Sequence, residues 1–586
     1  MDFTCPASLT CPSCIMLRKA VDPFVQAAGD LEIHDVGIQL SKARNGRLTM
    51  EYFRKKPRDE LREFDLIDIS TDENRACPWP SITVEPRGVR NPDAAAQRIT
   101  QWLETCKNGH ERCQLDLAHQ ALPTRVIDVS GEGKLRLRVT DVYDEGRYAC
   151  LSHCWGGLSV LCTTTSTYTS YQHHIPWDDL PTTFKHAIEL TKRIGIRYLW
   201  IDSLCIIQDD LGDWRHEGSK MASIYANSYI TFAAAASKNP TEGLYKPDGP
   251  ERYFTYQSQR SDDQAPYTIY VQPQRDHLAF IAGVLPLMQR AWYFQERILS
   301  PRVVSFAESE LYWECRVTQC CECGDQWPQR SFSEMPKPDI SPYPDHIVST
   351  QVNDWYKWQH LVKRYTRLNL TFQTDTLPAL QGIATMYQQT VKSVYLAGLW
   401  EKNLLQSLLW RSELFGNRPN KYRAPTWSWP SIHGWIEWWP GLISVTDEVA
   451  SILSASTIPA GLDPRGEIIG GSLVLQGRCI PATVGYRGIN ENFCPANCVR
   501  LTSGLHVGPG EWYPDISTNA TTQTEILLMQ MVELQSAIPK AMFFLGLKKL
   551  EDRDGTYERV GCARTENGGV IAAFRDHGEE RVVTVA

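Results

Sequence analysis

Two short segments of the chain hold polar side chains of kinds that bind small ligands. Residues 152–157 have the sequence Ser-His-Cys-Trp-Gly-Gly, and residues 205–210 have the sequence Cys-Ile-Ile-Gln-Asp-Asp. Each segment ends an apolar run typical of a buried strand, and open parallel sheets bind ligands where such strands end. We therefore expect the two segments to form a cleft. Its candidate ligand-binding residues are Ser152, His153, Trp155, Gly156, Asp202, Gln208 and Asp209.

Two carboxylates near this cleft allow more than one role. Glu217 lies about one turn into the helix expected after the second segment, where the helix N-terminus stabilises negative charge. It could hydrogen-bond a ribose or stabilise an oxocarbenium-like centre, as carboxylates do in glycosidic cleavage. The alternative is a solvated first-turn acid with no part in a site. Asp202 lies inside an apolar run, so structural hydrogen bonding is its alternative to a role in the cleft.

A third set of residues has metal-like spacing. Cys106, His110 and Cys113 are separated by three and two residues, and the break at Gly109 would let their side chains converge. A structural zinc ion needs a fourth ligand, which a tertiary contact would have to supply. The candidates for this ligand are Cys5, Cys11, Cys14 and Cys77. The spacings among Cys315, Cys320, Cys321 and Cys323 match no common zinc module, and these four are expected to be plain thiols.

The elements that would position these residues alternate between strands and helices. Amphipathic patterns predict helices at residues 181–194 and 213–226. Nearly continuous apolar runs predict buried strands. These strands are expected at residues 147–152, 198–206 and 229–236. The order strand, helix, strand, helix, strand predicts an α/β fold with a doubly wound parallel sheet.

The rest of the chain divides into regions of different character. A helix is expected at residues 97–106, and a pair of strands at 124–129 and 134–142. Further helices are expected at 354–365 and 377–391, and short apolar runs with turn residues indicate a β-rich end. We predict a mixed N-terminal region at 1–120, the α/β domain at 121–330, a helical and loop connecting region at 331–440 and a β-rich C-terminal region at 441–586.

Composition and charge narrow the function classes. The chain has 586 residues, 42% of them hydrophobic, and a formal net charge of -8, which disfavours nucleic-acid binding driven by bulk charge. No apolar run approaches the ~20 residues of a membrane span. The start of the chain has no basic segment followed by an apolar stretch, so no secretory signal is expected. We expect a cytoplasmic protein that binds no nucleic acid and does not span a membrane.

The same segments resemble the heterokaryon-incompatibility (HET) domain family of fungi. Residues 148–156 are similar to the opening segment of that domain, and residues 180–184 with 198–209 are similar to its second block. Further similarity lies at Met221 with residues 224–226, and at 290–300 and 313–315. Residues 424–429 and 557–561 are similar to C-terminal segments found in the family. The resemblance is dense from about residue 100 to residue 330.

This resemblance implies a fungal protein of nonself recognition and regulated cell death. The family's domain is similar to Toll/interleukin-receptor (TIR) domains, some of which hydrolyse NAD with a glutamate on the helix after a central strand. Glu217 is the residue that best matches that glutamate, which would make it catalytic and NAD the substrate. Two alternatives remain open: a non-catalytic module that assembles with a protein partner or itself, and an accessory protein of a biosynthetic gene cluster.

Overall fold

A computed structural model of the chain forms two compact units. The first comprises residues 1–210, 227–288 and 300–336, and the second comprises residues 211–226, 289–299 and 337–586. The described residues are 91–113, 120–131, 135–158, 161–245, 283–308, 310–322, 354–413, 416–439, 447–461, 463–485, 498–507, 511–516, 524–534, 540–586 and shorter pieces that include the strands β1–β4, β10, β11 and β15. None of the described helices is long and apolar enough to cross a membrane.

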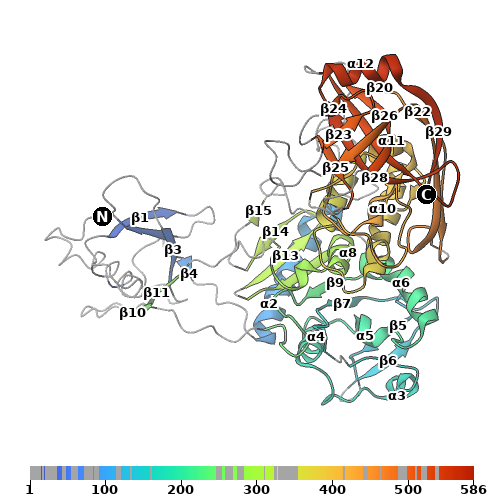
Figure 1. Cartoon of the computed structure of the whole chain (residues 1–586). Helices are drawn as coiled ribbons and strands as arrows, with labels where there is room; N and C mark the ends of the chain where they lie inside the picture. The colour runs from blue at the N-terminus through green and yellow to red at the C-terminus, as the bar shows by residue number, and fades with distance from the viewer. Residues whose placement is uncertain are drawn as a thin grey trace. The chain divides into compact units, whose positions relative to one another are not determined.

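The first unit is built on a nine-stranded sheet (Figure 1). Its strand order is β15-β14-β13-β12-β9-β7-β8-β5-β6. The bounds are β5 Arg125–Asp128, β6 Arg136–Val139, β7 Tyr148–Ser152, β8 Tyr198–Ile201, β9 Ile230–Ala233, β12 Arg302–Phe306, β13 Leu311–Cys315, β14 Gln319–Cys321 and β15 Gln326–Trp327.

The centre of this sheet is parallel, as predicted, and its flanks are not. Strand β7 pairs in parallel with β8 on one side and β9 on the other, so that Leu151 lies opposite Ile201 and Phe232. Strand β12 pairs in parallel with β9. The predicted doubly wound parallel sheet is confirmed only for this centre. The whole sheet is mixed, because β5–β6 and β12–β15 pair antiparallel. The connections within these flanks are too short for the crossover that parallel pairing requires.

Helices beside the sheet follow from amphipathic patterns. The predicted helix between β7 and β8 is α4 (Thr182–Arg193), which buries Phe184 and Ile188. The helix predicted at 97–106 is part of α2 (Pro92–Gly109), where the side chain of Asn91 caps the N-terminus. A solvent-exposed ion pair of 2.7 Å joins Arg193, at the end of α4, to Asp93 in the first turn of α2. Shorter helices are η3 (Glu111–Cys113), α3 (Tyr168–His173) and η5 (Leu287–Gln289).

Strand β8 is shorter than its apolar run predicted. It ends at Ile201, and Asp202–Cys205 form one helical turn, α5. Thr163 satisfies the backbone of this turn, since its amide donates to the Ser203 carbonyl at 2.9 Å and its hydroxyl to the Leu204 carbonyl at 2.6 Å. A short buried helical turn and a buried strand have the same apolar pattern, so composition alone could not separate them.

The second unit contains a group of helices around α10 (Gln381–Val391). Helix α10 packs against α6 (Leu211–Ala226) and α8 (Ala291–Leu299), and the helix predicted at 354–365 is α9 (Asp354–Tyr365). The helix predicted at 377–391 begins with a separate 3-10 turn, η7 (Pro378–Leu380). Smaller elements are η6 Gln373–Thr376, β16 Tyr395–Leu396, β17 Leu399–Trp400, η8 Glu401–Asn403, α11 Leu404–Ser407, β18 Arg411–Ser412, η9 Trp429–Ser431 and β19 Ile436–Glu437.

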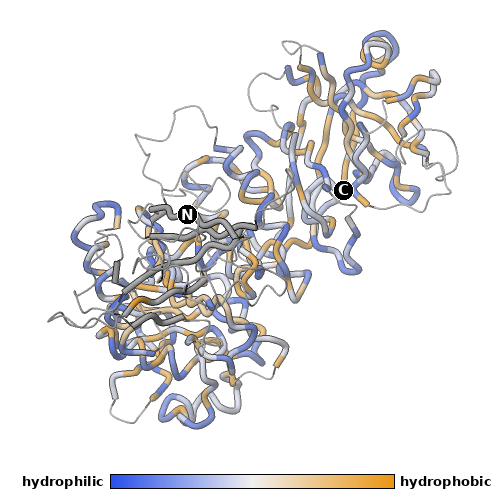
Figure 2. Tube along the Cα trace, turned by 90° about the vertical axis from the view of Figure 1, so that its left-hand side faces the viewer, coloured by the Kyte–Doolittle hydropathy of each residue, from blue (hydrophilic) through white to orange (hydrophobic). Residues whose placement is uncertain are grey.

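A ten-stranded sheet forms the C-terminal part of the second unit, which confirms the predicted β-rich region. Figure 2 shows hydrophobic residues along its strands. Phe544 of the sheet packs against Phe574 of the helix that follows β28, within a buried cluster. Its elements are β20 Asp447–Glu448, β21 Ser451–Pro459, β22 Ile468–Gly485, β23 Cys498–Leu501, β24 His506–Val507, β25 Trp512–Pro514, β26 Thr524–Leu534, β27 Ala541–Lys549, β28 Thr556–Thr565 and β29 Glu579–Val585, with helix α12 Gly568–His577.

A separate six-stranded sheet joins two distant stretches of the first unit. Strand β11 pairs antiparallel with β3, so residues 268–273 extend a sheet begun before residue 85. The bounds are β1 Val36–Lys42, β2 Leu48–Arg54, β3 Phe64–Thr71, β4 Thr83–Val84, β10 Phe254–Gln257 and β11 Thr268–Pro273.

A fully buried ion pair lies inside the second unit. Arg559 of β28 contacts Asp515 at 3.1 Å, and neither side chain is exposed to solvent. The guanidinium also lies over the ring of Trp410, 3.3 Å from its centroid. Burial raises the pKa of Asp515 to about 6 and lowers that of Arg559, and each charge opposes the shift of the other. Removing either partner leaves the other charge buried without its ion-pair partner.

We expect Arg559→Met to lower the free energy of unfolding by about 3–5 kcal/mol, the usual cost of breaking a buried pair from one side. Urea denaturation of the purified protein measures this loss. Arg553→Met is the control, because the side chain of Arg553 is 66% exposed and its loss should cost less than about 0.5 kcal/mol. Equal stability of the two variants would contradict a structural role for the pair.

Candidate functional site

A hydrogen bond joins the loops that follow β7 and β8. The indole Nε1 of Trp155 donates to Oδ2 of Asp202 at 3.0 Å, and the amide of Ser203 donates to Oδ1 at 2.7 Å. Asp202 is the first residue of α5, directly after β8, so its carboxylate lies at the carboxyl edge of the parallel strands. The structure thus brings together two of the residues that the sequence singled out.

His153 faces the same carboxylate. Its Nδ1 lies 3.7 Å from Oδ1 of Asp202, and its ring meets the ring of Phe184 edge-on at 4.9 Å between centroids. The side chain of His153 is 1% exposed and that of Asp202 is 28% exposed. The carboxylate is therefore the part of this group that solvent or a ligand can reach, while the imidazole lies behind it.

The loop after β9 also reaches this place, which the sequence analysis missed. Gly156 has a φ of +68°, and a Cβ there would meet the Cβ of Asn239 and lie 2.7 Å from the Lys238 carbonyl oxygen. The two loops are therefore in close contact through a position that only glycine fits. The strand order β8-β7-β9 explains the contact, since it places the ends of β7 and β9 side by side.

Three other predicted residues have internal partners. The side-chain amide of Gln208 donates to the carbonyls of Asp202 at 3.1 Å and Ile206 at 3.2 Å. The carboxylate of Asp209 accepts from the hydroxyl and the amide of Thr165, and these hydrogen bonds lower the pKa of Asp209. Ser152 is the buried last residue of β7, and its carbonyl accepts from the amide of residue 234. These hydrogen bonds fix the backbone of the loops that follow β7 and β8.

Glu217 lies in a different setting from the one expected. It belongs to α6 in the second unit, whereas residues 152–157 and 205–210 belong to the first. Its side chain is 1% exposed, and one carboxylate oxygen lies 3.7 Å from Nζ of Lys220 and 3.8 Å from Nε2 of His216. The alternative of a solvated first-turn acid was wrong, because α6 begins at Leu211 and buries this position in its second turn.

The Cys/His set converges in the first unit and gains a fourth member. Ligand atoms of Cys106, His110, Cys113 and Cys315 all lie within 4.8 Å of one another. Cys315, which was expected to be a plain thiol, is a free cysteine that lies within this cluster. Strand pairing explains its place, because β13 sets Cys315 opposite Arg302, which contacts Cys106 and Cys113.

Of the other cysteines expected to be plain thiols, one is a free thiol and one is not. Cys320 is a free, buried thiol, whereas Cys321 is disulfide-bonded and not a plain thiol. The four earlier candidates for the fourth ligand, and Cys323, lie outside the described residues.

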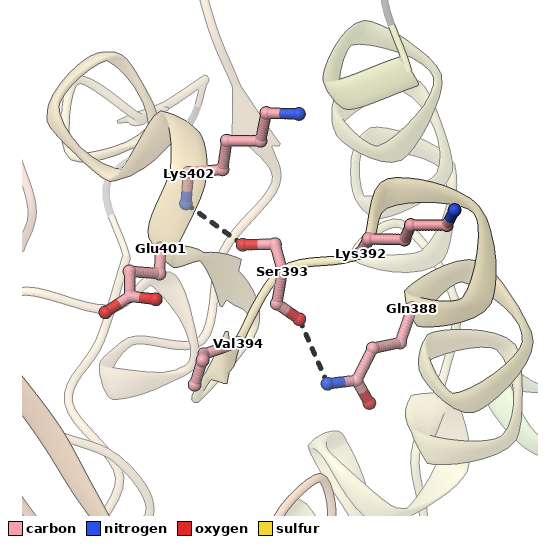
Figure 3. A pocket seen from close by; sticks show the side chains of 6 residues that line it. All are labelled: Gln388, Lys392, Ser393, Val394, Glu401 and Lys402. Carbon is pink, nitrogen blue, oxygen red and sulfur yellow. Dashed lines mark hydrogen bonds between the residues drawn. The ribbon is translucent and has the colours of Figure 1, made fainter.

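The second unit has a surface pocket that is lined by none of the residues discussed above. Its volume is about 480 Å³, and Figure 3 shows Ser393 at its centre, accepting from the side chain of Gln388 and the amide of Lys402 at 3.0 Å each. The lining residues are Gln388, Lys392, Ser393, Val394, Glu401 and Lys402. It is shallow and holds none of the predicted site residues.

Comparison with known families identifies the central part of the chain. Residues 148–296 match the family model of the heterokaryon incompatibility protein (HET). The chain carries a HET domain. The match begins at the first residue of β7 and ends within α8, so it includes both loop segments and Glu217. No curated protein and no solved structure gives a significant match.

The two glycines of the HET domain's first loop allow a matched test of the contact between loops. Gly156 and Gly157 both have positive φ, but a Cβ at position 157 meets nothing within 4 Å. Alanine should therefore cost about 1–2 kcal/mol at position 157 for the backbone conformation alone.

We expect Gly156→Ala to cost about 1–3 kcal/mol more than Gly157→Ala, because overpacking against Asn239 adds to the same backbone cost. Thermal and urea denaturation of the two variants measure the difference. Equal destabilisation would show that the loops after β7 and β9 do not touch at Gly156.

Proposed function

We propose that this protein acts in fungal nonself recognition, that is heterokaryon incompatibility, and that its HET domain triggers regulated cell death. The family match over residues 148–296 supports the process. The Trp155–Asp202 hydrogen bond carries the assignment of a site, because it holds together two loops at the edge where parallel sheets bind ligands.

The contacts of the site favour a preformed binding surface. Gln208 and Asp209 are held by hydrogen bonds within the domain, and Gly156 lies against the loop after β9. Such a surface loses little conformational entropy on binding, which suits recognition of a protein partner or a second copy of the chain. Assembly through this edge is therefore the form of the proposal that the geometry supports best.

The C-terminal region would control the domain through its helices. Helices α6 and α8 lie within the matched span, and α10 lies outside it. The amide of Gly382 in α10 donates to Oε1 of Gln295 in α8 at 2.6 Å, and a Cβ at position 382 would meet the Cβ of Ala222 in α6. Helix α10 of the C-terminal region therefore packs directly against α6 and α8 of the HET domain.

We expect induced expression of the full chain in a filamentous fungus to kill the cells, and Asp202→Ala to abolish the killing, because Trp155 and Ser203 lose their acceptor. Vital-dye staining measures death, and immunoblotting checks that both proteins accumulate equally. Asp179→Ala, an exposed acid of the same domain, is the control and should kill as the wild type does. Healthy cells that accumulate wild-type protein would contradict the proposed function. Killing by Asp202→Ala would exclude this site.

Glu217 supports a second, catalytic candidate: cleavage of the bond between nicotinamide and ribose in NAD. Its carboxylate is withdrawn from water on the helix that directly follows residues 205–210. Burying a carboxylate is costly, so a buried acid beside a loop that ends a strand is a candidate for a functional role. In this candidate Glu217 stabilises the positive charge that develops on the ribose.

We expect purified protein, if catalytic, to release nicotinamide from NAD, and Glu217→Gln to lower the rate about 10²–10³-fold, the usual loss when one electrostatic stabiliser is removed. Chromatography of the released nicotinamide measures both rates. Glu189→Gln is the control, since its side chain is 37% exposed. Release that survives Glu217→Gln would remove this residue from the mechanism. No release by concentrated wild-type protein would leave the assembly function alone.

A further inference from the structure

The four-residue Cys/His cluster is independent of the proposed function and begins with a local feature of the sequence. Cys106 lies in the last turn of α2, and Cys113 ends the short helix η3. Backbone hydrogen bonds wrap the segment, since His110 donates to the Cys106 carbonyl at 3.2 Å and Cys113 donates to the His110 carbonyl at 2.9 Å. This double turn directs three side chains with nitrogen or sulfur donors to one point.

The fourth member comes from a distant strand. Cys315 ends β13, and its Sγ lies 3.4 Å from Nδ1 of His110, 205 residues earlier in the chain. Cys106, Cys113 and Cys315 are all free thiols with at most 3% exposure. Three unbridged thiols buried within 4.8 Å of one imidazole need an explanation beyond packing, and a shared metal ion supplies it.

Hydrogen-bonding groups surround the four residues in the way that they surround the ligands of a bound metal ion. The hydroxyl of Thr318 lies 3.3 Å from Nε2 of His110, which orients the ring so that Nδ1 faces the cluster. The amide of Thr318 donates to Sγ of Cys315 at 3.3 Å, and Nε of Arg302 donates to Sγ of Cys106 at 3.4 Å. Such second contacts fix the orientation of metal ligands and stabilise thiolates.

Charge and ligand type select the metal. Three thiolates and one neutral imidazole around a divalent ion carry one net negative charge, which the buried guanidinium of Arg302 balances. Three sulfurs and one nitrogen form one of the usual tetrahedral sets for structural zinc, whereas most iron–sulfur clusters are held by four cysteines. Zinc–sulfur bonds of about 2.3 Å place the donor atoms of a tetrahedron about 3.8 Å apart, which the observed separations allow.

We propose that Cys106, His110, Cys113 and Cys315 bind one structural zinc ion. Four protein ligands leave no coordination position for a substrate, so the ion has a structural role. It ties the segment that precedes the HET domain to strand β13, which lies beyond the matched span. The ion thus links two segments of the first unit that are about 200 residues apart in the chain.

Metal analysis of the full-length protein tests this proposal. Protein purified without chelators should contain one zinc ion per chain by mass spectrometry, and Cys315→Ser should lower the zinc content about tenfold or more at equal protein concentration. Cys320→Ala, a buried cysteine outside the cluster, is the control and should retain the zinc. Another metal in equal amount, no zinc uptake by the wild type, or full zinc content in Cys315→Ser would overturn the proposal.

Two further measurements do not depend on a ligand variant that folds. Wild-type protein loaded with cobalt(II) should show thiolate-to-cobalt charge transfer and the strong visible bands of a tetrahedral site, and spectra without them would overturn the assignment. Thr318→Val should weaken zinc binding about 10–100-fold in chelator competition, since it loses the contact to His110. Val317→Ala, an exposed neighbour, should not. Equal zinc affinity of the two variants would count against Thr318 as the residue that orients His110.

Discussion

Strand β7 is the constraint on which the rest of the HET domain depends. All five of its residues are buried, and its two edges are occupied by β8 and β9, both parallel to it. The three loops that leave these strands must therefore start at one edge of the sheet. The Trp155–Asp202 hydrogen bond and the contact of Gly156 with Asn239 both follow from this arrangement.

Burial then decides how the polar groups at both edges of the sheet are used. Asp128 ends β5 at the opposite edge, beside the start of β8, because the two strands are antiparallel. Its burial alone would raise its pKa, but hydrogen bonds from Arg197 and Ser130 hold that pKa well below its usual range. Thr163 similarly satisfies the carbonyls of the helical turn after β8. Because Thr163 holds this turn, the loop after β8 has a fixed backbone at the carboxyl edge of the sheet.

Predictions from local sequence patterns failed where the same pattern fits more than one structure. The apolar run after Tyr198 predicted one strand, yet its second half is a helical turn, since Thr163 rather than a neighbouring strand satisfies its backbone. Glu217 looked like a solvated first-turn acid, but it lies in the second turn of α6 and its side chain is buried. Cys315 matched no zinc spacing, because its partners are about 200 residues away in the chain.

The sequence by itself determined the alternation of strands and helices and the parallel centre of the sheet, and it predicted that residues 152–157 and 205–210 meet at one edge. These depend on hydrophobic periodicity and on the rule that parallel strands end at one edge, both of which act over short stretches of chain. In the structure, Trp155 contacts Asp202 at this edge. Only the tertiary structure decided the antiparallel pairing of β5 with β8, the third loop at Asn239 and the place of Cys315 in the cysteine cluster. Those features arise from pairing between distant segments, and no local pattern encodes which distant partner a buried group will meet.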